Sequence, residues 1–242
     1  MNAFSYIGQE LEIFEHARNW KKYWSSEIRP YVSGDVLEVG AGFGANTELL
    51  KSPRISSWTC LEPDAALVEK MRSRFENQPH LSDCRIEIGT TETLSVGNQF
   101  DGILYIDVLE HIEADREELE RASRLLREGG RVVVLAPAHQ WLYTAFDRAI
   151  GHFRRYDKSS LSACMPSDGT IMRLNYLDSV GMVASLANRF LLRKAQPSLE
   201  QILFWDSFLV PPSRFMDRLT LNRIGKSVLC VWRKGGFAKT AR

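Results

Sequence analysis

Three glycines at alternate positions form the first part of the sequence that could bind a ligand. They are Gly40, Gly42 and Gly44, in the stretch LEVGAGFGA that spans residues 37–45. Glycine lets the backbone approach a ligand closely, and a helix that begins just after such a turn directs its amide groups at the ligand. The spacing fits two nucleotide classes, because Ala45 completes a G-x-G-x-x-A pattern while Glu38 completes E-x-G-x-G-x-G.

Two carboxylates near the glycines bear on which nucleotide is bound. Glu38 suits a ligand with an ammonium and a sulfonium, as in S-adenosylmethionine, and would repel the pyrophosphate of a dinucleotide such as NAD. Glu62 follows Gly42 by twenty residues, the distance expected of an acid that binds ribose, and it satisfies both patterns. The E-x-G-x-G-x-G pattern, and with it S-adenosylmethionine, is favoured, because a dehydrogenase usually needs a second sizeable domain and too little chain remains after residue 137.

The segment 137–161 holds the densest set of side chains that could act on a substrate. Histidine titrates in the range a general base needs, and arginine can bind a carboxylate or phosphate through paired hydrogen bonds. We consider as catalytic candidates His139, Tyr143 and His152. We consider as substrate-binding candidates His111, Arg154, Arg155 and Tyr156. The alternatives are structural histidines bonded to the backbone and surface ion pairs, for example with Asp157.

Strands that alternate with helices must position these groups. Apolar runs with strand character occur at residues 35–40, 57–64, 84–94, 100–107 and 131–138, and again at 169–177 and 226–234. The run RVVVLA is apolar at nearly every position, as a strand covered on both faces should be. Right-handed crossovers then predict a doubly wound α/β fold with a parallel sheet, whose ligands bind beyond the carboxyl ends of the strands.

Helix signals lie between these strands. Apolar residues at three- and four-residue steps predict a helical segment over residues 1–30, which Pro30 ends. Asp64 is placed to cap the helix that follows the second strand. Asp115 with Glu118 resembles a capping box for a helix over 116–128, which Gly129 and Gly130 would end. We expect a single domain over 1–242, with an N-terminal cap at 1–30 and substrate-side insertions at 138–168 and 178–225.

Composition excludes several classes of protein. The chain has 242 residues, 44% of them apolar, and a net charge of +1, so the overall charge indicates no partner. From Arg189 onward there are eleven Lys and Arg against three Asp and Glu, which could face phosphate, a membrane surface or nucleic acid, or be a solvated basic face.

The cysteines and the apolar runs bear on location. The four cysteines form no C-x-x-C pair and show no zinc spacing, so we expect no metal, and free thiols in a reducing cytoplasm. The N-terminus does not resemble a secretion signal, and no apolar run approaches the roughly 20 residues that span a bilayer.

Taken in order, the motifs resemble those of the class I S-adenosylmethionine-dependent methyltransferases. VLEVGAGFGANT is similar to the first motif of the family, LEPD to its second and FDGILYIDVLEHI to its fourth, over residues 35–137. The resemblance implies a seven-stranded Rossmann-like sheet of order 3-2-1-4-5-7-6 with an antiparallel seventh strand. It also implies S-adenosylmethionine as cofactor and S-adenosylhomocysteine as product.

The resemblance also implies roles for individual residues. The backbone from Gly40 to Gly44 should line the methionine part, with Glu38 near the ammonium group, and Glu62 should accept both ribose hydroxyls. Pro63 or Asp64 should flank the adenine, and Thr90 stands where many relatives have an acid. We expect the cofactor-binding residues to be Glu38, Gly40, Ala41, Gly42, Gly44, Glu62, Pro63, Thr90, Thr91, Glu92, Asp107 and Val108, with Trp20 and Tyr23 from the N-terminal helix.

The acceptor is inferred less directly. Segments such as VPPSRFMDRL (210–219) and the loop at 137–161 resemble a bacterial group that accompanies glycan or lipid-linked sugar biosynthesis, which implies a small-molecule or glycan acceptor. Nucleic acid is disfavoured, because IDVLEH stands where the N/D-P-P-Y/F signature is expected. A protein acceptor and a non-catalytic S-adenosyl-binding module are further alternatives. The apolar, basic insertion at 178–225 could cap the site, form a homodimer face or contact a membrane surface.

Overall fold

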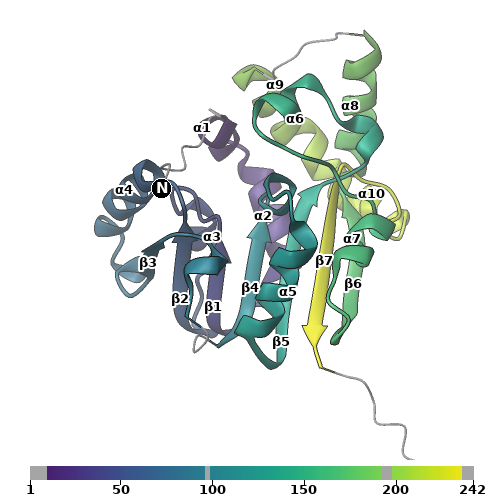
Figure 1. Ribbon diagram of the computed structural model, residues 1–242. Helices are drawn as coiled ribbons and strands as arrows, with labels where there is room; N and C mark the ends of the chain where they lie inside the picture. The colour runs from purple at the N-terminus through teal and green to yellow at the C-terminus, as the bar shows by residue number, and fades with distance from the viewer. Residues whose placement is uncertain (1–9, 96–98, 192–197, 236–242) are drawn as a thin grey trace, which may run out of the picture.

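A seven-stranded sheet forms the centre of the computed structural model, which describes residues 10–95, 99–191 and 198–235 (Figure 1). The strands are β1 (Gly34–Val39), β2 (Ile55–Glu62), β3 (Arg85–Ile88), β4 (Phe100–Ile106), β5 (Leu126–Pro137), β6 (Gly169–Leu177) and β7 (Ser227–Lys234). Their spatial order is β3-β2-β1-β4-β5-β7-β6. β7 runs antiparallel to both neighbours, while β1 to β5 are mutually parallel. The expected fold class and strand order are confirmed.

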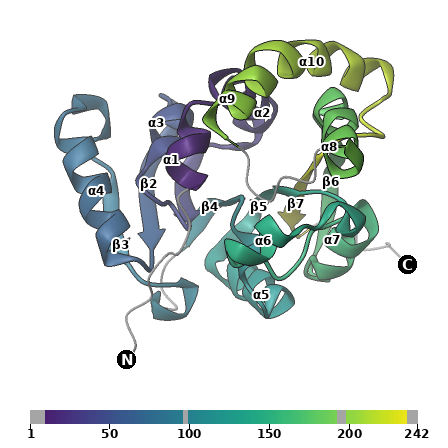
Figure 2. The ribbon, with the colours of Figure 1, turned by 90° about the horizontal axis from the view of Figure 1, so that it is seen from above.

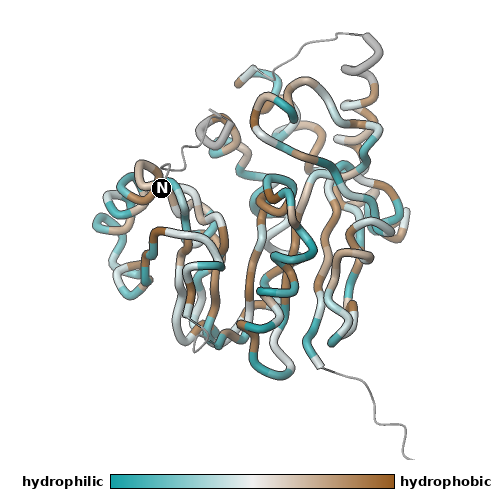
Figure 3. The backbone as a smooth tube through the Cα atoms, viewed as in Figure 1, coloured by the Kyte–Doolittle hydropathy of each residue, from teal (hydrophilic) through white to brown (hydrophobic). Residues whose placement is uncertain are grey.

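Alternating side chains along the strands build two cores, one on each face of the sheet. On one face, Val36, Trp58 and Leu104 belong to a cluster that includes residues of the helices before and after β1. On the other, Leu37 and Ile103 pack with residues that follow β4. Figure 3 shows the hydrophobic residues concentrated along the central strands. The strands therefore read as apolar runs because both of their faces are covered.

Helices cover both faces. The α-helices are α1 (Glu10–Glu15), α2 (Arg18–Ile28), α3 (Ala45–Leu50), α4 (Ala65–Glu76), α5 (Asp115–Leu125), α6 (Ala145–Ala149), α7 (Lys158–Cys164), α8 (Ser179–Leu191), α9 (Leu199–Phe204) and α10 (Val210–Leu219). Short 3-10 turns are η1 (Arg29–Tyr31), η2 (Pro79–Leu81), η3 (Thr91–Thr93), η4 (Leu109–His111) and η5 (Gln140–Leu142), and η6 (Trp205–Leu209) is π-helical. Seen from above, α2, α9 and α10 lie on one side of the strands and α5, α6 and α7 on the other (Figure 2).

The helices α1, α6, α8 and α9 lie above the carboxyl ends of the parallel strands (Figure 1). Three buried carboxylates hold the segment from α8 to α10 in place. Asp206 accepts hydrogen bonds from the amides of Asn19 and Trp20 at 3.0 and 2.8 Å, which anchors this segment to the start of α2. Asp217 accepts from the Tyr23 hydroxyl at 2.7 Å and from two amides after β6. Asp178 accepts from Trp205 Nε1 at 2.8 Å. The insertion is thus packed against the N-terminal helices.

Local helix boundaries differ from the sequence predictions in three places. The N-terminal helical segment is divided into α1 and α2, and residues 1–9 of the expected cap lie outside the described residues. The predicted capping box is wrong, because Asp115 is the first residue of α5 and accepts from Tyr156 and Arg154 instead. The glycine pair does not end α5, because strand pairing with β4 already begins at Leu126 and takes the chain out of the helix.

Other local predictions are confirmed. Asp64 caps α4, accepting from the amides of Ala66 and Leu67. β6 has the predicted bounds, and β7 begins one residue later than predicted. Within the described ranges, no helix combines the length and apolar character that a membrane crossing requires.

Candidate functional site

A cavity of about 840 Å³ opens where β1, β2 and β4 end. Its volume is within the range of roughly 300–1,000 Å³ typical of small-ligand sites. Of the residues expected to bind the cofactor, its wall includes Trp20, Gly40, Ala41, Gly42, Glu62, Pro63, Thr90, Thr91, Glu92, Asp107 and Val108. The carboxyl edge of the sheet therefore brings together residues from four separate strand ends.

The glycine turn after β1 has a conformation that depends on glycine. Gly40 has a φ of 64°, and a Cβ added there would lie 2.7 Å from a methyl group of Val108. Any other residue would therefore be strained and would displace Val108, which also borders the cavity. The amide of Gly40 donates to the Leu61 carbonyl at 2.8 Å, so the turn is tied to the end of β2.

Glu62 connects the glycine turn to the cavity. Its two carboxylate oxygens accept from the Gly42 amide at 2.8 Å and from the Asp64 amide at 3.0 Å. A carboxylate has about four acceptor positions, so each oxygen keeps capacity for one further donor. Burial raises the pKa of Glu62, against the two amide hydrogen bonds, which lower it. The two amides therefore fix the carboxylate in the cavity wall, where each of its oxygens can still accept a hydrogen bond from one hydroxyl of a diol.

Glu38 lies elsewhere than its expected role requires. It is 1% exposed and accepts from Thr47 Oγ1 at 2.5 Å and Trp58 Nε1 at 3.1 Å, beneath the turn and outside the cavity wall. Burial raises its pKa to about 7. The structure therefore does not place this carboxylate for direct contact with an ammonium group, because its position on β1 directs it to the face that holds Val36.

The segment after β3 forms another part of the wall. Thr91 donates its hydroxyl proton to Glu118 at 2.7 Å, and Glu92 pairs with Arg121 at 3.2 Å. Both contacts join the segment to α5 beside the cavity. The side chain of Thr91 is thus already engaged, which leaves its backbone as the part that could face a ligand.

Ionisable side chains gather at the end of β4. Asp107, Glu110 and His111 follow this strand, and His152 and Arg155 come from the insertion after β5; all five line the cavity. The insertion is held to η4 by the amide of Phe153, which donates to the Glu110 carbonyl at 2.8 Å. This end of the cavity combines acids, bases and a guanidinium.

Burial shifts the pKa values there in both directions. It raises the pKa of Asp107 to about 6 and that of Glu110 well above its ordinary value. It lowers the pKa of His111 to about 4. Burial alone would raise the pKa of Asp147, but hydrogen bonds from His152 and Arg155 outweigh it and hold that pKa below its ordinary value. Groups with pKa values displaced by burial and by specific partners are typical of functional sites.

Several expected site residues do not line this cavity; they are Gly44, Tyr23, His139, Tyr143, Arg154 and Tyr156. Each of the five with a side chain has a contact that accounts for its position. Tyr23 donates to Asp217, and Tyr156 and Arg154 both contact Asp115 at 2.7 and 2.6 Å. His139 Nε2 lies 3.0 Å from the Gly225 carbonyl, and Tyr143 donates to the His152 carbonyl at 2.6 Å. These five side chains hold the insertion and the cap together.

Sequence reasoning missed Glu110, Asp147, Lys226 and Trp205. Glu110 precedes His111 in the segment after β4, and an acid beside a candidate histidine at a strand end is a signal that could have identified it. Asp147 accepts from Arg155 Nε at 2.8 Å, and Lys226 lies 4.0 Å from the Trp205 ring in the cavity wall. No local pattern marks Lys226, which directly precedes β7, or Trp205, which the insertion brings to the site.

Comparison with known proteins is consistent with this geometry. Residues 37–134 match the family model described as a methyltransferase domain. A curated protein in transposon Tn4556 of Streptomyces fradiae is 29% identical over 136 residues, which are 55% of this chain and 38% of that protein. The chain spans well under half the length of the curated relatives that it matches.

Solved structures share the fold. YcgJ from Bacillus subtilis superposes with a TM-score of 0.60 and 17% identity, covering 90% of this chain and 99% of that one. The N-methyltransferase NodS of Bradyrhizobium japonicum, in complex with S-adenosylhomocysteine, gives a TM-score of 0.57 and 17% identity over 92% of this chain and 88% of that one.

Proposed function

We propose that this chain is a class I S-adenosylmethionine-dependent methyltransferase, and that it moves the methyl group of that cofactor to an oxygen or nitrogen of a small-molecule or glycan-type acceptor. The observation that carries the proposal is the position of Glu62, whose carboxylate lies in the cavity wall and binds the amide of Gly42 in the glycine turn. When bound, S-adenosylmethionine supplies a methyl group on a sulfonium and leaves as S-adenosylhomocysteine.

The residues fit such a ligand. The Glu62 oxygens offer acceptor positions for both ribose hydroxyls, and the backbone of Gly40, Ala41 and Gly42 borders the cavity without side chains larger than a methyl group. Pro63 and the segment from Thr90 to Glu92 also border the cavity, which supports a role for them beside the adenine. Trp20 closes the cavity together with Trp205, with ring centroids 5.8 Å apart. We propose these groups as the cofactor contacts.

Glu38 has a different role in this proposal. It holds Thr47 at the start of α3 and Trp58 on β2, and so positions the glycine turn that separates it from the cavity. Gly44 is the residue before α3, with a φ of 82°, and a Cβ there would lie 2.5 Å from Phe75. Both residues therefore shape the turn without contacting the ligand.

The acceptor occupies the other end, between Asp107 and His152. Methyl transfer forms a bond from the acceptor atom to the methyl carbon as the carbon–sulfur bond breaks, and a protonated acceptor releases its proton. Of the three catalytic candidates, His152 alone borders the cavity among the residues described. Arg155 and His111 border it too, and we propose them as acceptor contacts, whereas Arg154 and Tyr156 support the insertion.

The partners and the location follow from other features. Phe208 and Phe215 expose 66% and 65% of their surface on the helices over α2, and we propose that this face contacts a second copy of the chain. Light scattering over a concentration series tests this, and a constant monomer mass contradicts it.

All four cysteines are free thiols, which supports a cytoplasmic location. Recovery of the native protein in a secreted fraction would contradict it.

The acceptor class has a direct test. The purified protein is incubated with S-adenosylmethionine labelled in the methyl carbon and with extracts separated into metabolites, glycans, proteins and nucleic acids. We expect label in the metabolite or glycan fraction, and none there with a Glu62→Ala variant. Label confined to nucleic acid or protein would overturn the acceptor class, and absence of transfer to every fraction would favour a binding module.

A further inference from the structure

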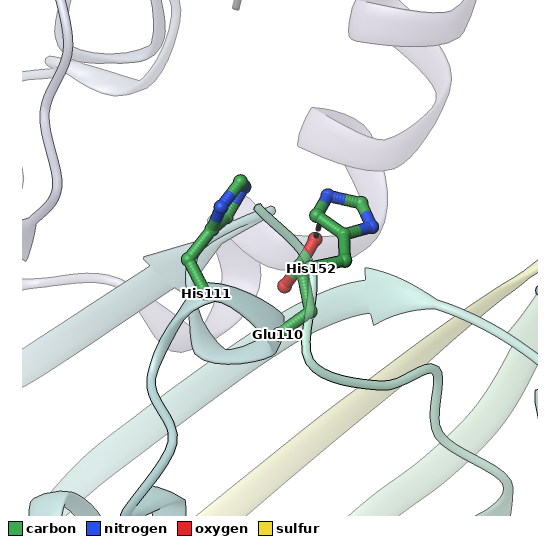
Figure 4. Close-up of side chains that lie close together, drawn as sticks. All are labelled: Glu110, His111 and His152. Carbon is green, nitrogen blue, oxygen red and sulfur yellow. Dashed lines mark ion pairs between the residues drawn. The ribbon is translucent and has the colours of Figure 1, made fainter. Parts of the chain in front are cut away.

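A carboxylate and two imidazoles meet at the acceptor end of the cavity. Glu110, His111 and His152 each offer one atom, a carboxylate oxygen or a ring nitrogen, and these atoms lie within 4.8 Å of one another (Figure 4). The two histidine rings are 4.5 Å apart between centroids, at 86° to each other. Two of these residues lie in η4 and the third lies about forty residues further along the chain, so the cluster exists only because the insertion docks on η4.

Glu110 is the member whose surroundings are incomplete. Its side chain is fully buried, and neither carboxylate oxygen has a hydrogen-bond partner among the residues that the structure describes. The nearest cationic candidate is His152, whose Nε2 lies 3.8 Å from Oε1, beyond hydrogen-bond distance. A buried carboxylate without partners is unfavourable by several kcal/mol unless a proton or a cation compensates it. The carboxylate faces the two imidazoles, so a cation bound among the three groups would compensate it.

His152 is oriented as metal-binding histidines are. Its Nδ1 lies 3.1 Å from Asp147 Oδ1, and this carboxylate is fixed by Arg155 and by the Thr144 amide. An Nδ1–H donated to Asp147 leaves the lone pair on Nε2, the nitrogen that faces Glu110. A carboxylate bound to the far nitrogen of a ligating histidine is a common outer-shell partner, which fixes the ring and makes it a better ligand.

We propose that Glu110, His111 and His152 bind a divalent transition-metal ion, for which zinc is the best match. Two imidazoles and one carboxylate are a common ligand set for zinc, and a site with three protein ligands keeps one position open. Ligand atoms around tetrahedral zinc are about 3.4 Å apart, given bonds of roughly 2.0–2.1 Å. The observed 3.8 Å between His152 and Glu110 is close to that separation, so small side-chain rotations would complete the site.

The open position would face the cavity, where Asp107 and Arg155 also lie. A cation there would lower the pKa of an acceptor hydroxyl beside it, and the released proton would pass to solvent water as the oxygen bonds the methyl carbon. This role rests on the proposed function, whereas metal binding itself does not. The sequence led us to expect no metal, because the three ligands follow no zinc spacing.

Metal binding is tested on the full chain after removal of metals with a chelator that is then dialysed away. Zinc chloride is titrated calorimetrically into the wild type and into Glu110→Gln, His152→Gln and Asp147→Asn variants. His80→Ala is the matched control, because His80 is an exposed histidine in η2. We expect one zinc per chain in the wild type and the control. Zinc should bind at least tenfold more weakly to Glu110→Gln and to His152→Gln, and 10- to 100-fold more weakly to Asp147→Asn.

Two outcomes would overturn the inference. One is a wild type that binds no zinc, and the other is a Glu110→Gln variant that binds it as the wild type does. Glu110→Gln removes an unpaired buried charge, so the variant should fold, and titration with S-adenosylhomocysteine checks that its cofactor site is intact.

Labelled methyl transfer, measured before and after chelation, separates this inference from the proposed function. Transfer by a wild type that takes up no zinc in the titration would overturn the metal site and leave the methyltransferase function standing. Zinc binding without any transfer would support the site and count against the function.

Discussion

At the scale of the residue, Glu62 is the side chain on which the proposed cofactor site depends most. It binds the glycine turn through Gly42 and the start of α4 through Asp64, while facing the cavity. Glu62→Ala should weaken S-adenosylhomocysteine binding by about 100-fold, because hydrogen bonds to a charged acceptor contribute roughly 1.5–3 kcal/mol each. Isothermal titration measures this directly.

Glu69→Ala is the matched control for that experiment. Glu69 lies on the exposed face of α4, where it pairs with Arg72 at 2.6 Å. Its removal should leave the affinity unchanged. Equal affinities for the two variants would refute the role proposed for Glu62.

Glu38 should make stability depend on pH. Its pKa is about 7 in the folded protein and near the ordinary 4.5 when unfolded, so the folded state binds more protons between these values. Stability therefore falls as pH rises from about 4.5 to 7, by up to about 3 kcal/mol for this group. Glu38→Gln removes this contribution. The free energy of unfolding of the variant minus that of the wild type should therefore be larger at pH 8 than at pH 5. Urea unfolding at both pH values checks this; a difference between the two proteins that does not vary with pH would contradict it.

At the scale of the element, the N-terminus of α2 is capped by a residue far away in sequence. Asp206 accepts from the amides of Asn19 and Trp20, and Trp20 packs against Trp205 in the cavity wall. Asp206→Ala should lower the free energy of unfolding by about 2 kcal/mol, because two buried amides lose their acceptor. It should also weaken cofactor binding, since α2 helps to close the cavity.

Asp83→Ala provides the comparison, because Asp83 is largely exposed and forms a surface ion pair with Lys51. Such pairs contribute at most about 1 kcal/mol. Urea midpoints of both variants are compared at the same pH. An Asp206 variant no less stable than the Asp83 variant would mean that this tertiary cap does not hold the helix.

At the scale of the whole molecule, cofactor binding should stabilise the entire fold. The cavity is built from strand ends, from α2 and from the insertion, so a bound ligand connects parts of the chain that are distant in sequence. At a free concentration 100 times its dissociation constant, S-adenosylhomocysteine should add about 2.7 kcal/mol to the free energy of unfolding. For a chain of this length that corresponds to a rise in Tm of roughly 5–10 °C. NAD at the same concentration should give no shift in differential scanning fluorimetry; a shift with NAD alone would contradict the assigned cofactor.

Much of the cofactor end could be predicted from sequence because its signals are local. The glycine turn, Glu62 and Asp64 each lie at the end of an apolar run, and parallel strands bring their carboxyl ends to one edge. Glu38 was assigned by charge alone, and the alternation of side chains along β1 directs it to the opposite face from Leu37. Asp115 was assigned by spacing alone, and the partners it meets in the fold replace the capping role.

The sequence by itself therefore determined the alternation of strands and helices and the glycine turn with Glu62 twenty residues after Gly42, since periodicity, turn chemistry and strand-end spacing act over a few residues, and the resemblance of its motifs implied the sheet order and the cofactor class. Only the tertiary structure decided the acceptor end. Glu110 and His152 meet because one backbone hydrogen bond joins the insertion to η4, and Trp205 reaches the cavity because Asp178 and Asp206 hold its segment. These contacts depend on how two long insertions pack on the sheet, and no local pattern encodes that packing.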